Sequence, residues 1–193
     1  MKNPYTKKGD IAMKKYVGAI DLGTTSNRFF LFDKNADSVE FAQKEHRQIF
    51  PQPGWVEHDP MEILDNTCQV IETALARSGI SADQIDSIGI TNQRETCVVW
   101  DKKTGTPCCN AIVWQCTRSD DICDRLIRKY GQSFFVSRTG LPVTSYFSGP
   151  KVTWILENVA RAKKMKDSGD LLFGTIETWV IWWLTGGPGK GSH

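Results

Sequence analysis

The sequence lacks any strong excess of charge and any long apolar run. Its 193 residues carry a formal net charge of +2, which is too small to indicate a surface for nucleic acid or for an anionic membrane. The first dozen residues are polar and have no apolar core, which excludes a secretory signal there. The most apolar stretch, 176–184, is far shorter than the about 20 residues of a membrane-spanning helix. We therefore expect a cytoplasmic protein in which the tryptophans of 176–184 lie in a buried helix.

The sequence also lacks the residue spacings of a metal site or of a disulfide framework. Its six cysteines form no CxxC pair, and the adjacent Cys108 and Cys109 cannot easily bridge each other. We expect free thiols in a reducing compartment. Of the three histidines, His46 and His58 fall within the expected folded region. They are far apart and have no companions at ligand spacing, so we assign them no metal role.

The composition predicts one folded domain with an irregular segment at each end. The sequence is 40% hydrophobic and 24% charged, which is ordinary for a globular protein. Residues 1–13 are expected to form a disordered leader, and residues 14–186 the domain itself. The glycine-rich residues 187–193 are expected to form a flexible tail.

Three strands with short joints open the expected domain. The segment 16–21 is mostly apolar, 28–33 is rich in aromatic residues, and 39–47 begins with alternating apolar and polar residues. The joints 22–26 and 34–37 are rich in residues that favour turns, such as Gly, Asn and Asp. Short turns between strands predict an antiparallel meander.

A helix with clear start and stop signals follows these strands. Asp59 suits the N-cap, Pro60 suits the first turn, and Glu62 is placed to complete a capping box. Gly79 ends the run. Apolar residues recur at spacings of three and four, which predicts a buried face made of Met61, Leu64, Cys68, Ile71 and Leu75.

The rest of the chain mixes strands with helices. Further strands are expected at 85–91, 96–100 and 111–113, and helices at about 120–130, 150–163 and 175–184. Strands that come first and are then mixed with helices predict an α/β domain whose opening sheet is antiparallel.

The sharpest local signal is the segment DLGTTS, which follows the first strand. A turn that contains Gly23 can present closely spaced backbone N–H donors to a phosphate, with no side chain in the way. Thr24, Thr25 and Ser26 add hydroxyl donors, and Asp21 adds a carboxylate that can hold a magnesium ion directly or through water. The alternative is a plain hairpin turn. The segment is neither a Walker A loop nor a GxGxxG motif.

Two further signals lie at the ends of expected strands. Arg94 and Glu95 follow an apolar strand and suit a ligand with hydroxyl groups, because arginine donates and carboxylate accepts. A surface ion pair is the alternative. Trp114 can form a wall against which a carbon skeleton rests, or can simply belong to the core. Tyr146, in the loop 145–149, can donate to a ligand or can be merely half-buried.

Taken in order, these segments resemble the glycerol kinases of the FGGY family of carbohydrate kinases. The resemblance covers about 15–186 and rests on DLGTTSNR, GWVEHDP, GITNQRET, NAIVWQC, YFSGPK and LFGTIETW. GITNQRET and NAIVWQC are specific to glycerol kinases within the wider superfamily. The resemblance implies a ribonuclease-H-like, actin-like ATPase fold with a mixed sheet, of which this chain is the truncated amino-terminal domain.

The resemblance also assigns roles to individual residues. The positions that match the ATP phosphate site are Gly23, Thr24, Thr25, Ser26 and Arg28. Asp21 matches the acidic residue near Mg²⁺. The positions that match the glycerol site are Arg94, Glu95, Trp114 and Tyr146.

The implied reaction transfers the γ-phosphoryl group of ATP to the terminal hydroxyl of glycerol, in a full-length protein that can form homo-oligomers. Glycerol kinases are more than twice as long as this chain, and the resemblance places their catalytic base, an aspartate, beyond His193. We therefore expect no catalytic base in the chain and little or no activity from it alone. One alternative is a natural truncation that acts as a binding or assembly module. Another is a kinase for a different polyol or sugar, which Arg94 and Glu95 together with Trp114 disfavour.

Overall fold

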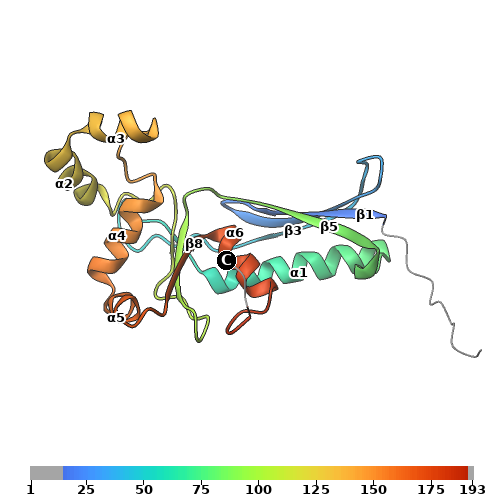
Figure 1. Cartoon of the computed structure of the whole chain (residues 1–193). Helices are drawn as coiled ribbons and strands as arrows, with labels where there is room; N and C mark the ends of the chain where they lie inside the picture. The colour runs from blue at the N-terminus through green and yellow to red at the C-terminus, as the bar shows by residue number, and fades with distance from the viewer. Residues whose placement is uncertain (1–14, 191–193) are drawn as a thin grey trace, which may run out of the picture.

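A four-stranded mixed sheet begins the part of the chain that the computed structural model describes, residues 15–190 (Figure 1). Its strands are β1 (Tyr16–Leu22), β2 (Ser26–Phe32), β3 (Ser38–Glu45) and β5 (Ile85–Asn92), in the spatial order β3-β2-β1-β5. The first three strands pair antiparallel, which confirms the predicted meander. β5 pairs parallel to β1, so the sheet is mixed, as the resemblance implies. The predicted leader, 1–13, lies outside the described residues.

Helix α1 (Pro60–Ser78) crosses beneath this sheet and makes the parallel return to β5 possible (Figure 1). Its predicted ends are confirmed: the Asp59 side chain accepts from the N–H groups of Met61 and Glu62, and Gly79 adopts the left-handed conformation at the C-cap. The predicted capping box is not formed. The Glu62 carboxylate accepts instead from the backbone N–H and Nε of Arg47.

The buried face of α1 agrees with the predicted one in part: Leu64 is buried, and Ile71 and Leu75 pack against the core, but Met61 does not. Met61 is 38% exposed, whereas the small residues Thr67 and Ala74 are fully buried with Ile63. The reason is a polar residue on the inner face of the sheet. Asn27 of β2 is buried and donates from Nδ2 to Ile63 O at 2.6 Å and to Thr67 Oγ1 at 2.9 Å. The face that can accept these hydrogen bonds turns toward the sheet.

A second four-stranded sheet is antiparallel throughout and positions the rest of the site. It consists of β4 (Glu57–His58), β7 (Ala111–Ile112), β6 (Cys97–Asp101) and β8 (Leu171–Thr175), in that spatial order. Strands β6 and β7 were predicted from the sequence. The short strands β4 and β8 were not, because neither shows the alternation that marks a longer strand.

Four helices flank the second sheet away from α1 (Figure 1). They are α2 (Asp120–Tyr130), α3 (Gln132–Thr139), α4 (Ser148–Asn158) and α5 (Ala160–Ser168); a short 3₁₀ turn, Ala82–Gln84, precedes β5. The predicted single helix at 150–163 is wrong, since Val159 is extended (φ −107°, ψ 103°) and separates α4 from α5. Helix α3 was not predicted, and none of its residues is buried.

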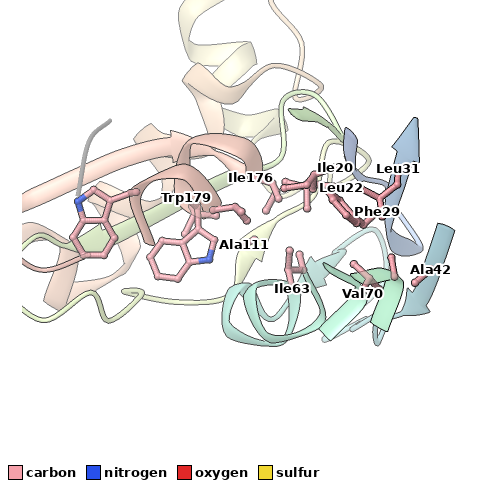
Figure 2. Packing of buried hydrophobic residues seen from close by; sticks show 14 of the residues in the cluster. Ile20, Leu22, Phe29, Leu31, Ala42, Ile63, Val70, Ala111, Ile176 and Trp179 are labelled. Atoms are coloured by element: carbon pink, nitrogen blue, oxygen red, sulfur yellow. The ribbon is translucent and has the colours of Figure 1, made fainter. Parts of the chain in front are cut away.

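Helix α6 (Ile176–Leu184) joins α1 on one face of the first sheet and completes the core. Figure 2 shows Ile63 and Val70 of α1 facing Phe29 of the sheet, with Trp179 of α6 farther along the same core. The predicted burial of this tryptophan-rich helix is confirmed for Trp179 and Trp182. No helix in residues 15–190 is both long and apolar enough to cross a membrane.

After α6 the chain turns back on itself through residues 186–190. Gly187 N–H donates to Trp182 O at 2.9 Å, and Lys190 N–H donates to Gly187 O at 3.1 Å. The rest of the expected tail, 191–193, lies outside the described residues, and the expected domain boundaries stay predictions.

Candidate active site

The turn between β1 and β2 requires glycine at its first position. Gly23 N–H donates to Ser26 O at 3.0 Å, and a Cβ atom on Gly23 would lie only 2.9 Å from that same oxygen. The turn is therefore tight, with its backbone exposed at the end of the two strands. The segment connects two antiparallel strands, as a hairpin turn does. It also carries the hydroxyl side chains that the sequence analysis expected to bind phosphate.

Gly23 and Thr24 lie in a cleft together with the residues expected to bind a polyol. The cleft has a volume of about 280 Å³, and its lining residues are Gly23, Thr24, Asn92, Gln93, Arg94, Trp114 and Tyr146. The structure thus brings together Arg94, Trp114 and Tyr146, which come from three distant parts of the sequence. No carboxylate belongs to this lining among residues 15–190.

A direct hydrogen bond joins the turn to the aromatic wall of the cleft. The indole Nε1 of Trp114 donates to Thr24 Oγ1 at 3.1 Å. The ring of Tyr146 meets that of Trp114 edge to face, with 5.8 Å between the ring centroids. Trp114 is also fixed by its backbone, because its N–H donates to Thr96 Oγ1 at 3.2 Å. The turn expected to bind phosphate and the wall expected to bind a polyol, which were predicted from separate segments, are therefore joined by one hydrogen bond.

Asp21 and Arg28 face each other across β1 and β2 at the rim of this cleft. They are paired in the strand register, and Arg28 Nη1 lies 3.2 Å from Asp21 Oδ2. Gln43 of β3 accepts from Arg28 Nε at 3.2 Å and donates to Ser26 Oγ at 3.2 Å. These side chains form a polar row on the strand ends, next to the turn but outside the cleft lining.

Glu95 lies beside the cleft in a strained backbone conformation. Its φ is +66°, which is rare for a residue with a side chain. Its carboxylate accepts from the Ser148 N–H at 2.8 Å and from Ser148 Oγ at 2.7 Å, at the start of α4. A carboxylate is favourable there because the helix N-terminus is positive. The carboxylate is therefore bound by Ser148 and does not form the ion pair with Arg94 that was the alternative.

A buried lysine, which sequence reasoning missed, holds the loop that carries Tyr146. Lys151 of α4 is fully buried, and its Nζ donates to Tyr146 O at 2.9 Å and to Ser145 O. Burial lowers the pKa of this ammonium group. A lysine one turn into an apolar helix gives no distinctive signal in the sequence, because such residues are usually exposed.

Asn92 and Gln93 also line the cleft, although the sequence analysis assigned them no binding role. Gln93 donates from Nε2 to Gly23 O at 3.2 Å and accepts at Oε1 from Thr96 Oγ1 at 3.0 Å. Asn92 Nδ2 donates to Glu177 of α6. Their place at the end of β5, directly before Arg94, was the signal that could have marked them.

The two histidines that the sequence analysis placed far apart are in contact. The rings of His46 and His58 meet edge to face, with 4.6 Å between their centroids, and both residues are buried. The expectation was wrong because the 46–58 loop folds back until Glu57 and Ile49 bridge each other. In the part of the chain that the structure describes, no three His, Cys, Asp or Glu side chains gather as metal ligands.

Both histidines are held neutral by their surroundings. Burial and, to a smaller extent, the adjacent His46 lower the pKa of His58 to about 3, although Gln93 opposes the shift. Burial also lowers the pKa of His46, although its hydrogen bond to Thr24 and the carboxylate of Glu62 oppose the shift.

The depressed pKa of His58 predicts a loss of stability in mild acid. Between pH 6.5, where the unfolded side chain titrates, and about pH 3, the unfolded chain binds a proton that the folded chain does not. The free energy of unfolding should therefore fall as the pH falls, by up to about 1.4 kcal/mol per pH unit from this group. Urea denaturation at pH 7, 6, 5 and 4 measures the slope. His58→Gln removes the titration and should flatten it; equal slopes in both proteins would contradict the assignment.

All six cysteines are free, as expected. Cys97 is fully buried, and burial raises the pKa of its thiol to about 12. A thiol with so high a pKa forms little of the reactive thiolate.

Comparison with known proteins gives one consistent result. Residues 16–191 match the family described as FGGY family of carbohydrate kinases, N-terminal domain. A glycerol kinase from Acidiphilium cryptum is 56% identical over 181 residues, which are 94% of this chain and 36% of that protein. A glycerol kinase from Chloroflexus aggregans is 54% identical over the same shares of the two chains. The chain thus spans 36% of the length of these curated relatives.

Solved structures agree with this result. The crystal structure of Plasmodium falciparum glycerol kinase with ADP is 34% identical, with a TM-score of 0.83 over 93% of this chain and 36% of that one. A xylulose kinase from Rhodospirillum rubrum is 25% identical, with a TM-score of 0.78 over 89% of this chain and 34% of that one. The actin-like fold expected from the sequence is therefore confirmed.

Proposed function

Because the chain belongs to the FGGY family of carbohydrate kinases, we propose that it carries the phosphate-binding turn and most of the glycerol pocket of an ATP-dependent glycerol kinase. The observation that carries this proposal is the hydrogen bond from Trp114 to Thr24 within one cleft. A phosphate donor at the turn and a polyol against Trp114 would lie side by side there, as phosphoryl transfer requires.

On the donor side, the backbone and hydroxyl groups of the turn bind the ATP phosphates. The residues we assign to this task are Gly23, Thr24, Thr25, Ser26 and Arg28. Asp21 would hold Mg²⁺ directly or through water, and the ion would supply charge neutralisation to the phosphates. The donor set fits that ion, because Mg²⁺ commonly takes one protein carboxylate and keeps several waters, and Asp21 is a partly exposed carboxylate next to the turn.

On the acceptor side, four residues bind glycerol. Arg94 donates to its hydroxyl groups, and Trp114 and Tyr146 pack against its carbon atoms. Glu95 accepts from a hydroxyl with the carboxylate oxygen that Ser148 leaves free, since both bonds from Ser148 go to Oε2. The left-handed backbone at Glu95 supports this role, since such strain often occurs at binding sites.

The described residues supply positioning and charge, but none of the residues that line the cleft has a carboxylate, and Glu95 beside it is assigned to binding a glycerol hydroxyl. A general base must come within about 3 Å of the hydroxyl proton, and the cleft lining contains no carboxylate. We propose that the 193-residue chain alone turns over slowly for this reason. We also propose a cytoplasmic location, which the six free cysteines support, and homo-oligomers of the full-length protein, which native mass spectrometry can measure.

The decisive test is glycerol binding by the chain and by its Arg94→Ala variant, measured by calorimetry. We expect weak binding by the unaltered chain and a loss of about tenfold to a hundredfold in the variant, because a charged hydrogen-bond donor is removed. Arg128→Ala on the exposed side of α2 is the matched control and should bind as the unaltered chain does.

Three outcomes would contradict the proposal or a part of it. If the Arg94→Ala variant bound glycerol as tightly as the unaltered chain, the assignment of this pocket to glycerol would be wrong. Tighter binding of xylulose than of glycerol would favour a kinase for another sugar. Steady glycerol-dependent production of ADP by the 193-residue chain, well above that of Arg94→Ala, would show that a base is present after all.

A further inference from the structure

Side-chain and backbone donors converge on the carbonyl groups of the β1–β2 turn. Thr24 O accepts two hydrogen bonds of 3.0 Å, from Nε2 of His46 and from Nε2 of Gln48. Gly23 O accepts from Gln93 Nε2 at 3.2 Å. Thr25 O accepts from the His46 N–H at 3.2 Å. Three consecutive carbonyls of the turn are therefore held by donors from outside it.

Holding the carbonyl of a peptide group fixes the direction of its N–H. In a planar trans peptide the C=O and N–H bonds point in opposite directions. The N–H of Thr25 thus points away from His46 and Gln48, and the N–H of Thr24 points away from the Gln93 amide. A phosphate is attracted by an N–H and repelled by a C=O, so this orientation decides whether the turn can bind an anion.

A hydrogen bond from His58 fixes the orientation of the Gln48 side-chain amide. Gln48 Oε1 accepts from His58 Nε2 at 2.8 Å, which leaves the Gln48 amide NH₂ to face Thr24 O. A carbonyl can only accept, so His46 and His58 both carry their proton on Nε2.

We propose that Gln48, His46 and His58 are positioning residues for nucleotide: they turn the Thr24 carbonyl away from the phosphate and so present the Thr25 N–H to it. This inference rests on the proposed function and extends it to residues outside the cleft. The three act through the backbone of the turn and do not touch substrate. Removing the donors lets the 24–25 peptide rotate and place a carbonyl where the anion binds.

The test uses the 193-residue chain, inorganic tripolyphosphate and ATP as probes, and backbone amide NMR signals as the readout. In the unaltered chain we expect the Thr24 and Thr25 amide signals to shift during titration with either probe. Gln48→Met keeps the length of the side chain and removes its donor, so we expect a five- to tenfold weaker affinity for both probes. Glycerol affinity should fall by a smaller factor, because Arg94 and Tyr146 do not contact Gln48 and Trp114 bonds the Thr24 side chain rather than the carbonyl that Gln48 holds.

Matched variants separate positioning from general stability. His46→Phe should weaken triphosphate binding as Gln48→Met does, and His46→Gln should restore it, because the glutamine amide can reach the position of Nε2. Gln69→Met, on the exposed face of α1, is the control for the substitution itself. Should Gln48→Met not fold, the imidazole ¹⁵N signals of the unaltered chain give a second test: we expect Nε2–H in both rings, and an Nδ1–H ring overturns the proposal.

The outcomes distinguish this inference from the function it rests on. Unchanged triphosphate affinity in folded Gln48→Met overturns the inference and leaves the kinase proposal standing. A lower melting temperature with unchanged affinity shows a structural role only and also overturns it. Absence of any shift with both triphosphate and glycerol in the unaltered chain overturns the proposed function and this inference together.

Discussion

Trp179→Ala is expected to lower the free energy of unfolding by about 3–5 kcal/mol, the range for removing a fully buried tryptophan. The side chain has no exposed surface, and its ring lies 5.3 Å from that of Trp100 and 5.8 Å from that of Trp183. Its Nε1 also donates to Pro60 O at 2.9 Å and so ties α6 to the first residue of α1. The substitution therefore creates a cavity and removes the hydrogen bond that links the two helices.

Urea denaturation followed by circular dichroism measures this loss. Trp179→Phe keeps an aromatic ring and loses the hydrogen bond, so its cost should be smaller than that of the alanine variant. Leu184→Ala, at a 46% exposed position of the same helix, is the control and should cost little. A loss below 1 kcal/mol in Trp179→Ala would mean that α6 contributes little to the stability of the described fold.

Arg118→Met is expected to cost a similar 3–5 kcal/mol, for an electrostatic reason. The Arg118 side chain is 2% exposed, and its Nη2 donates to Glu57 Oε1 at 2.6 Å. Its guanidinium carbon lies 3.9 Å from the ring centroid of Trp55 and 4.8 Å from that of Trp154. Methionine fills part of this space but leaves the Glu57 carboxylate without its cation, in a site that water reaches poorly.

A double-mutant cycle tests this explanation. Arg118→Met leaves the Glu57 carboxylate charged and unpaired, and Glu57→Gln removes that charge. The double variant should therefore be more stable than Arg118→Met alone and should regain more than half of the lost free energy of unfolding. The hydrogen bond that Asn110 Nδ2 donates to Glu57 can be kept by a glutamine oxygen. Additive losses in the double variant would show that packing between the two tryptophans, rather than the ion pair, explains the cost.

Local signals in the sequence predicted local structure well. The β1–β2–β3 meander and both ends of α1 followed from turn residues, a capping aspartate and a terminal glycine, all of which act on their immediate neighbours. The buried face of α1 was predicted only in part, because the burial of Ile63 depends on Asn27, 36 residues away. A pattern of apolar residues does not reveal a polar partner on another element.

The site shows the same division between local and distant determinants. The turn at Gly23 and the strand-end residues Arg94 and Trp114 carried signals that the structure gathers in one cleft. Lys151 and the contact between His46 and His58 did not, since each depends on how one loop folds back on itself, which no residue pattern marks. Resemblance to a family identified the fold. The roles of the individual site residues are proposals that the binding experiments test.

The hydrogen bond between Trp114 and Thr24 has a thermodynamic consequence for an enzyme built on this cleft. In the proposed function Trp114 belongs to the acceptor half-site and Thr24 to the donor half-site, so one bond is common to both binding equilibria. Where both ligands change the strength of that bond, binding of the polyol changes the affinity for the nucleotide. The coupling is reciprocal: a nucleotide that displaces Thr24 changes the affinity for the polyol by an equal factor.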